Sequence, residues 1–214
     1  MKLNSFFNSS TSYRVRIALA LKGVEFEYVA VNIRTGEHRA VNYVANVNPS
    51  ASVPAIVDGE FSLGQSLAII DWLDEKFPAP RLIPLDPERR ARVLELSYLV
   101  SCDVHPVNNL RVLKYLDATL KVSPEQKSAW YQHWVKEGME GVERLLEKYG
   151  SGPWCFGSEP TLADVCLVPQ IANALRLGCE LDAYPRSMAV YRQAIEHPAF
   201  ECAEPKLQPD FVSP

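Results

Sequence analysis

Four hydroxyl side chains follow one another near the N-terminus, at Ser9, Ser10, Thr11 and Ser12. Apolar residues recur after them at helical spacing over 15–22, which predicts a helix with Thr11 or Ser12 as its N-cap. The first turn of a helix has unpaired backbone N–H groups and a partial positive charge. Adjacent hydroxyls there can hold an anion such as a thiolate or a carboxylate, and the same residues would also suit an ordinary capped surface helix.

A second pair of candidate ligands stands at the start of another predicted helix. Gln65 and Ser66 come directly before an apolar pattern of helical spacing over 67–77. Backbone N–H groups and a serine hydroxyl at such a place can receive a carboxylate, and a plain serine N-cap is the alternative. The sequence therefore contains two candidate anion sites.

The elements that must position these groups alternate in type over residues 1–80. A strand built on Leu3, Phe6 and Phe7 precedes the first helix, and 25–31 reads as a second strand. The segment 32–48 reads as a loop with a short helix. Two short strands over 55–57 and 60–63 are joined by Asp58-Gly59, a strong hairpin signal. The predicted order is β-α-β followed by β-β-α.

A proline-rich stretch separates this part from a wholly helical remainder. Residues 78–87 contain four prolines and cannot be helical. Helices are predicted over 87–120 with a kink at Pro106, over 124–149, over 162–177 and over 185–195. We therefore expect a thioredoxin-like α/β domain over 1–80, a linker over 81–86 and an all-α domain over 87–214.

Composition limits the classes of function. The chain has 214 residues, of which 47% are hydrophobic, and a formal net charge of −4. This suffices for a substantial core, and without a basic stripe nucleic acid is not an expected partner. The N-terminus has no apolar signal region, and no uninterrupted run of 18 apolar residues occurs, so a cytoplasmic protein without a membrane anchor is expected.

Cysteines and histidines indicate no metal site. The five cysteines are odd in number, widely spaced and without a C-x-x-C pair, which favours reduced and mostly buried thiols. The four histidines have no further ligands at metal-binding spacing. No metal is therefore expected.

The segment 9–23 resembles the Ser-Ser-Cys-x-x-Arg-Val-Arg-Ile-Ala-Leu signature of the zeta class of glutathione transferases. Members of that class are maleylacetoacetate isomerases and the related maleylpyruvate isomerases. Further stretches are similar to the family, in the same order: Asn48-Pro49 with Val53-Pro54, Gln65–Ile70, Asp103–Asn109, Thr161–Asp164 with Val168–Gln170, and Tyr184-Pro185. The resemblance covers nearly the whole chain, and the layout of the domains agrees with it.

The resemblance implies a glutathione-dependent cis-trans isomerase that acts on a dianionic maleyl keto acid, and a homodimer. A glutathione thiolate would add to the activated double bond, rotation would follow in the enolate, and elimination would release the trans product. Fixed donors would stabilise the enolate charge. Two alternatives remain: a detoxifying transferase or dehalogenase, and a non-catalytic glutathione-binding module of the same fold.

The family roles map onto single positions of the first domain. Ser9, Ser10 and Thr11 would lie beside the glutathione sulfur and lower the pKa of its thiol. The backbone of Val53 would pair with the cysteinyl amide of the tripeptide. Gln65 and Ser66 would bind the γ-glutamyl carboxylate, whereas Tyr13 is assigned a structural role.

The second domain would supply the remaining roles. His105 and Asn109 are candidates for binding at the cofactor and second substrate, and His105 could equally be a core histidine beside a helix kink. Arg111 and Arg176 would hold the substrate carboxylates, because guanidinium groups are bidentate donors. Their alternative is a surface ion pair on a helix.

The chain departs from the family pattern at three positions. Thr11 stands where the zeta signature has cysteine, which excludes covalent chemistry there and resembles the maleylpyruvate branch. Asn8 stands where that branch carries an arginine, which weakens the assignment to maleylpyruvate. Ser50 follows Asn-Pro where the family has glutamine, so one glutathione contact is expected to be missing or mediated by water.

Overall fold

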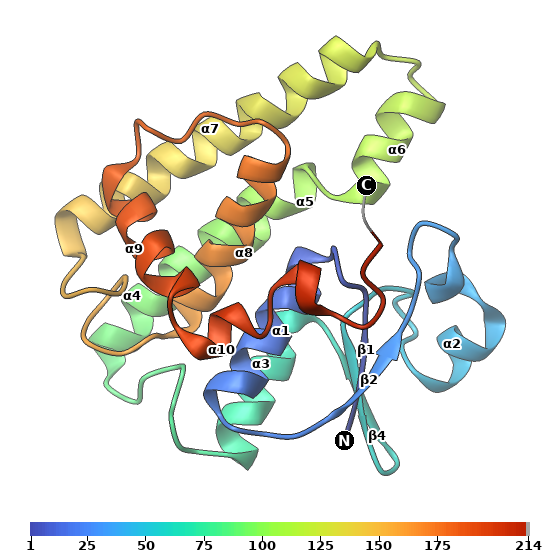
Figure 1. Ribbon diagram of the computed structural model, residues 1–214, viewed down its shortest axis with the longest axis horizontal. Helices are drawn as coiled ribbons and strands as arrows, with labels where there is room; N and C mark the ends of the chain where they lie inside the picture. Colours follow the sequence, from blue (N-terminus) through green and yellow to red (C-terminus); the bar gives the residue numbers. More distant parts are fainter. Residues whose placement is uncertain (213–214) are drawn as a thin grey trace. The chain divides into compact units, whose positions relative to one another are not determined.

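A four-stranded sheet with the strand order β2-β1-β3-β4 forms the centre of the N-terminal region (Figure 1). The computed structural model describes residues 1–212. The strands are β1 (Lys2–Ser5), β2 (Glu27–Ala30), β3 (Ala55–Asp58) and β4 (Phe61–Gly64). β1 pairs with β2 in parallel, and the β1–β3 and β3–β4 pairs are antiparallel. The predicted hairpin at Asp58-Gly59 is present.

Two helices pack together on one face of this sheet: α1 (Ser10–Leu21) and α3 (Ser66–Lys76). Figure 1 shows α2 (Val41–Asn46) on the other side of the sheet, preceded by a 3₁₀ turn over Glu37–Arg39. Leu3 of β1 lies between Tyr28 and Ile56 in the sheet register. Apolar side chains of the sheet and the two helices are fully buried and form the core: Leu3, Ile17, Leu19, Ile56, Ile70 and Leu73.

The start of α1 differs from the prediction. Ser9, and neither Thr11 nor Ser12, is the N-cap: its hydroxyl accepts from the Ser12 N–H at 3.2 Å. The strand also ends earlier than predicted, since Phe6 lies in a turn closed by the Ser9 N–H on the Phe6 carbonyl at 3.0 Å. Any of the four hydroxyl residues could serve as an N-cap. The turn that ends at Ser9 decides which of them does, because the helix begins directly after this turn.

The helical region contains six helices between residues 87 and 195: α4 (Pro87–Tyr98), α5 (His105–Val107), α6 (Leu110–Ala118), α7 (Pro124–Tyr149), α8 (Leu162–Arg176) and α9 (Pro185–Ile195). The helix α10 (Pro198–Glu201) and the 3₁₀ turn η3 (Pro205–Leu207) follow. The predicted boundaries of α7, α8 and α9 agree with these ranges.

The predicted helix over 87–120 is not one kinked helix. A π-helical turn, η2 (Leu99–Val104), ends α4, and α5 ends before a break at Asn108 and Asn109. Pro106 has no N–H to bond to the carbonyl four residues earlier, and its ring crowds that carbonyl. The Asn109 side chain then restarts the helix by accepting from the Arg111 N–H at 3.1 Å.

A buried carboxylate fixes the start of α8. Asp164 is fully buried and accepts from the N–H and the hydroxyl of Thr161, at 2.8 and 2.9 Å, and from the Cys155 N–H at 2.7 Å. Thr161 caps Asp164 in return, which completes a capping box. The loop before α8 is thereby tied to the helix that forms the centre of the second region.

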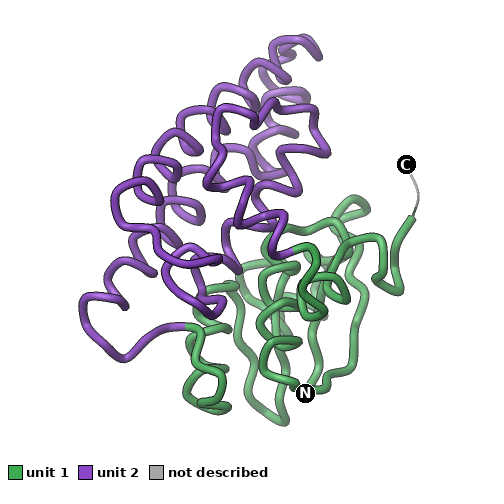
Figure 2. Tube along the Cα trace, turned by 60° about the vertical axis from the view of Figure 1, so that its left-hand side comes forward, with its two compact units in different colours: residues 1–82, 195–214 green, residues 83–194 purple. Residues whose placement is uncertain are grey.

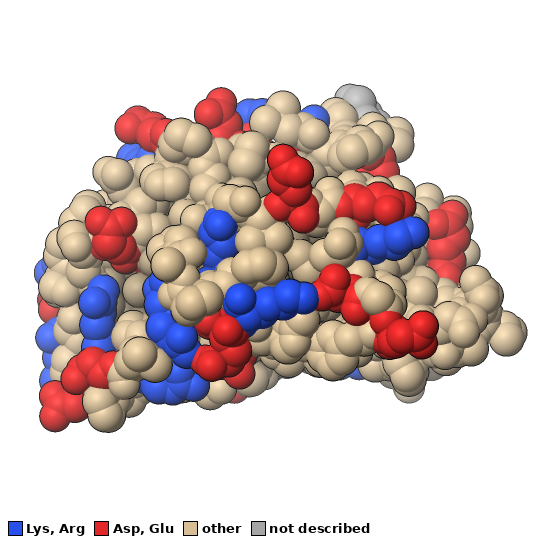
Figure 3. All heavy atoms as spheres, turned by 90° about the horizontal axis from the view of Figure 1, so that it is seen from below, with Lys and Arg blue, Asp and Glu red and all other residues tan. Residues whose placement is uncertain are grey.

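The chain divides into two compact units, Met1–Leu82 with Ile195–Pro214 and Ile83–Ala194 (Figure 2). This division differs from the predicted domains at the C-terminus, because the segment after α9 groups with the first unit. Among residues 1–212, no helix is both long and apolar enough to cross a membrane. On the face seen in Figure 3, acidic and basic side chains are interspersed.

Candidate functional site

The hydroxyl cluster at the N-terminus of α1 forms a short chain of hydrogen bonds. The Ser9 and Thr11 hydroxyl oxygens are 2.9 Å apart, and the Thr11 hydroxyl donates to the Val53 carbonyl at 3.3 Å. Ser10, the first residue of α1, is buried, whereas Ser9 and Thr11 are partly exposed. Ser9, Thr11 and Val53 are therefore brought together, as the predicted site requires.

The electrostatics of this helix start favour an anion. The first turn of α1 contains no acidic residue, so its partial positive charge is not neutralised locally. A hydroxyl has one proton to donate, and in this structure the Thr11 proton is directed to Val53. A thiolate beside the cluster would accept hydrogen bonds from the Ser9 or Thr11 hydroxyl, whose O–H would then turn away from its present partner.

The loop that carries Val53 is held by its own polar side chains. The Val53–Pro54 peptide bond is cis. The Asn48 side chain donates to the Ser52 carbonyl at 2.8 Å and accepts from the Ser50 hydroxyl at 2.8 Å. Ser50, which replaces the glutamine of the family pattern, thus supports the loop.

The start of α3 contains a buried hydroxyl next to a buried cation. Ser66 is 5% exposed, and its oxygen accepts from Nη1 of Arg14 at 3.4 Å. Because the oxygen accepts from Arg14, the Ser66 proton can be donated to a ligand. Gln65 is exposed, with a positive φ of 67°. An anion at this helix start would meet the backbone N–H groups, the serine hydroxyl and the guanidinium behind it.

Sequence analysis did not identify Arg14 as part of the site. Arg14 and Arg16 lie in the apolar pattern of α1, and both side chains are at least 98% buried. Charged residues are almost never fully buried unless they are paired. Two arginines inside an otherwise apolar helix were the available signal, and only the structure shows that Arg14 reaches Ser66.

The candidates of the helical unit lie on three helices: His105 in α5, Asn109 and Arg111 at the start of α6, and Arg176 at the end of α8. Nδ2 of Asn109 is 3.4 Å from Nε2 of His105, and both side chains are partly buried. Arg111 follows them at the exposed start of α6. Arg176 lies at the end of α8 and donates to the Asn173 side chain at 3.0 Å. The structure therefore joins His105 to Asn109 and places Arg111 two residues on, whereas Arg176 comes from another helix.

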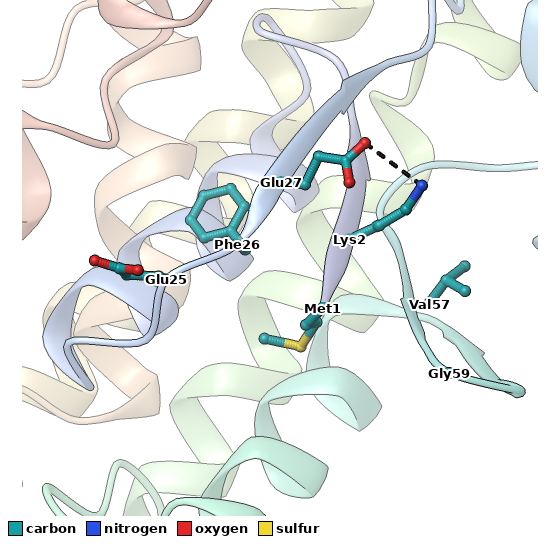
Figure 4. A pocket seen from close by; sticks show the side chains of 7 residues that line it. All are labelled: Met1, Lys2, Glu25, Phe26, Glu27, Val57 and Gly59. Carbon is teal, nitrogen blue, oxygen red and sulfur yellow. Dashed lines mark ion pairs between the residues drawn. The ribbon is translucent and has the colours of Figure 1, made fainter.

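An open hollow of about 650 Å³ lies elsewhere, at the amino end of β1 (Figure 4). Its lining includes Met1, Phe26 and the ion pair between Lys2 and Glu27, whose charged atoms are 3.5 Å apart. The hydroxyl cluster follows the carboxyl end of the same strand, at Ser5. This hollow is therefore not part of the candidate site.

The donors of the first unit suit a peptide that carries a thiol and a carboxylate. The α1 cluster offers hydroxyls to a thiolate, and Ser66 with Arg14 offers charge-assisted donors to a carboxylate. Val53 presents backbone groups in the loop that contacts the cluster. These features correspond to the parts of glutathione.

Comparison with known proteins gives matches along the whole chain. The family model for the N-terminal domain of glutathione S-transferase matches residues 1–75, and that for the C-terminal domain matches residues 128–193. Maleylacetoacetate isomerase of Pseudomonas aeruginosa is 47% identical over 213 residues, which cover 98% of each chain.

Two solved structures are similar throughout. A maleylpyruvate isomerase, a bacterial zeta-class glutathione S-transferase, superposes with a TM-score of 0.96 at 44% identity, covering 99% of this chain and 100% of the other. A maleylacetoacetate isomerase of Methylobacterium extorquens AM1, solved with malonate and GSH bound, gives a TM-score of 0.95 at 31% identity and covers 100% of each chain. The predicted fold, a thioredoxin-like domain followed by a helical one, is confirmed.

Proposed function

The chain belongs to the glutathione S-transferase family and to its zeta class, and from this premise we propose that it is a glutathione-dependent cis-trans isomerase of a maleyl keto acid. Maleylacetoacetate is the first candidate substrate and maleylpyruvate the second, because relatives at 47% and 44% identity are named for these two activities. Asn8, where the maleylpyruvate branch has an arginine, favours the first.

The observation that carries the proposal is the hydroxyl cluster at the N-terminus of α1, together with Ser66 and Arg14 in the same unit. Bound glutathione would supply a thiolate that adds reversibly to the substrate double bond. Ser9, Ser10 and Thr11 would hold that sulfur in its charged form by donating hydrogen bonds. Val53 would pair with the peptide backbone, and Gln65 and Ser66 would bind the γ-glutamyl carboxylate.

We assign the second substrate to the helical unit. Arg111 and Arg176 would bind the carboxylates, and His105 and Asn109 would complete the cofactor and substrate contacts. Support for a carboxylate site comes from the Methylobacterium extorquens relative, whose structure contains malonate, a dicarboxylate, together with GSH. In this chain both arginines are exposed, so their donors are accessible to a ligand.

The proposed enzyme is a cytoplasmic homodimer. Within residues 1–212, which include all five cysteines, no disulfide is formed, as is usual in a reducing compartment. Phe61 of β4 and Trp72 of α3 stack with ring centroids 5.3 Å apart, and Phe61 is 44% exposed. Such an aromatic pair at the edge of the sheet is consistent with a contact between two subunits.

Product analysis tests the proposal. The purified protein is incubated with glutathione and, in parallel, maleylacetoacetate, maleylpyruvate or a neutral aryl halide. We expect the fumaryl product from one of the maleyl acids while the total glutathione stays constant. Consumption of one glutathione per substrate without isomerisation would instead identify a conjugating transferase. Retention on glutathione resin without any turnover would identify a binding module.

A further inference from the structure

The C-terminal segment after α9, which belongs to the first unit, reaches the helix that begins with the hydroxyl cluster. The Tyr13 hydroxyl donates to the Phe200 carbonyl at 3.3 Å, and Nε of Arg16 donates to the Ala203 carbonyl at 2.9 Å. In Figure 1 the red C-terminal segment runs beside the end of β1. These contacts join α1 to residues almost at the other end of the chain.

Asp210 makes the most direct connection. One of its carboxylate oxygens accepts from the Phe7 N–H at 3.0 Å, and the other accepts from the Tyr28 hydroxyl at 2.6 Å. Burial, followed by the hydrogen bond to Asp210, raises the pKa of Tyr28, so that its hydroxyl remains protonated and donates. The carboxylate thus joins the turn before α1 to the edge strand β2.

The turn that Asp210 contacts is also held by Arg16. Arg16 donates to the carbonyls of Phe6 and Phe7, at 3.4 and 3.1 Å. Burial lowers the pKa of Arg16 to about 10, which leaves the guanidinium charged at neutral pH. The peptide group between Phe6 and Phe7 (the Phe7 peptide) is therefore held at both ends, by the Arg16 cation at its carbonyl and by the Asp210 carboxylate at its N–H.

Aromatic contacts close the same turn. The Phe7 ring lies edge-on to the Phe211 ring, with centroids 5.5 Å apart. The Arg34 guanidinium lies 5.3 Å from the centroid of Phe7. Phe7 is 4% exposed. The tail therefore excludes water from the Phe7 peptide, where a hydrogen bond to a carboxylate is worth more than at the surface.

We propose that residues 208–212 form a latch that fixes the turn Phe6–Ser9, with Asp210 as a positioning residue for the hydroxyl cluster. Ser9 follows Phe7 by two residues, and its N–H bonds to the Phe6 carbonyl. Displacement of the Phe7 peptide is therefore transmitted to Ser9 and to its partner Thr11. The proposal rests on the proposed function, since the position of the cluster matters only if it holds a thiolate.

Asp210→Ala in the full-length protein tests the latch with two readouts. The first is the hydrogen exchange of the Phe7 amide by NMR, without glutathione, which we expect to become at least tenfold faster. The second is the pH titration of the thiolate absorbance of bound glutathione. We expect a higher thiol pKa and a fall of about 10- to 100-fold in kcat/KM, the size of effect produced by small displacements of reacting groups.

Two further variants separate positioning from general loss of stability. Glu201→Ala removes an exposed carboxylate from the same segment and should leave both readouts unchanged. Asp210→Asn keeps an oxygen that can accept from the Phe7 N–H and should restore most of the activity. If Asp210→Ala equals Glu201→Ala in both readouts, the latch is refuted. If glutathione bound to the wild type shows an ordinary thiol pKa, the proposed function fails. Hydrogen exchange of the Phe7 amide then tests the latch by itself.

Discussion

Thr11 is the residue whose replacement separates thiolate stabilisation from helix capping. Ser9 both caps α1 and contacts Thr11, so a change of Ser9 would cost about 1 kcal/mol of cap stability as well. Thr11→Val keeps the shape and removes the hydroxyl. We expect the apparent pKa in the pH profile of kcat/KM to rise by about 1, because a hydrogen bond to the charged form is lost.

The sign of this change follows from the linkage between binding and ionisation. Donors to the thiolate lower the thiol pKa, so their loss moves the profile to higher pH and lowers activity below the new pKa. Thr119→Val, a change at an exposed threonine after α6, is the matched control and should leave the profile in place. An identical profile for both variants would exclude Thr11 from the mechanism.

Ser66 is expected to act on binding rather than on the chemical step. Its hydroxyl accepts from Arg14 and can donate to a carboxylate, so Ser66→Ala should lose a charge-assisted contact worth about 1.5 to 3 kcal/mol. The KM for glutathione should then rise at least tenfold with a smaller effect on kcat. Initial rates at varied glutathione measure this.

A serine nearby provides the control for Ser66. Ser62 is an exposed residue of β4, and Ser62→Ala should leave the KM for glutathione unchanged. An unaltered KM in Ser66→Ala would reduce this serine to a structural residue of the helix start. A parallel rise in both variants would indicate a general effect of destabilising the β4–α3 region.

At the scale of elements, the π-helical turn η2 packs so closely on α7 that no side chain fits at Gly138. A Cβ on Gly138 would lie 2.1 Å from Cγ2 of Val104, a buried and stiff side chain. Overpacking costs about 1–3 kcal/mol of stability. The higher helix propensity of alanine relative to glycine offsets up to about 1 kcal/mol of this cost. Gly138→Ala should therefore lower the free energy of unfolding by about 1–2 kcal/mol in urea denaturation.

A second glycine of α7 supplies the contrast. A Cβ on Gly141 would lie 3.2 Å from Cδ2 of Leu99, the end of a flexible side chain, so Gly141→Ala should be neutral or slightly stabilising. Combining Gly138→Ala with Val104→Ala should recover part of the loss, because the smaller residue makes room. Equal effects of the two glycine variants would contradict this account of the packing.

The boundaries that sequence analysis predicted correctly have strong local signals. The predicted starts of α7 and α8 agree with the structure, where Ser123 and Thr161 each form a capping box with the residue three positions on. The turn η2 and the break at Asn108 could not be predicted in this way. Apolar spacing over 87–120 is compatible with one helix kinked at Pro106, and it does not show the π-helical turn or the new helix start at Asn109.

At the scale of the whole molecule, the two units have separate proposed tasks. The thiolate machinery belongs to the first unit, whereas Arg111 and Arg176 belong to the second. Arg111→Ala or Arg176→Ala should lower kcat/KM for a maleyl substrate about 10- to 150-fold, the equivalent of 1.5 to 3 kcal/mol. A neutral electrophile has no carboxylate to lose, so its rate should stay nearly constant.

An exposed arginine elsewhere in the second unit controls for charge. Arg144 of α7 lies 3.7 Å from Glu140, and Arg144→Ala should leave both substrates unaffected. If Arg111→Ala and Arg176→Ala impair both substrates equally, the residues are structural. If neither substrate is affected, the carboxylates are bound elsewhere.

Local sequence patterns predict most of the overall fold, but they do not predict where the C-terminal segment packs. Element order, the hairpin at Asp58-Gly59 and the proline-rich stretch are local signals, and the family resemblance supports them. The hydrogen bond between Phe7 and Asp210 joins residues 203 positions apart. No periodicity or motif in the tail indicates it, which is why the C-terminal segment was expected in the helical domain.

The use of the glutathione thiol as the catalytic group is the central claim of this account, and S-methylglutathione tests it most directly. Conversion of maleylacetoacetate to its fumaryl isomer is followed with glutathione, with S-methylglutathione and with neither. We predict turnover with glutathione only, and competitive inhibition by the methylated peptide, which keeps the carboxylate proposed to bind at Ser66. Turnover with S-methylglutathione at a comparable rate would contradict the claim.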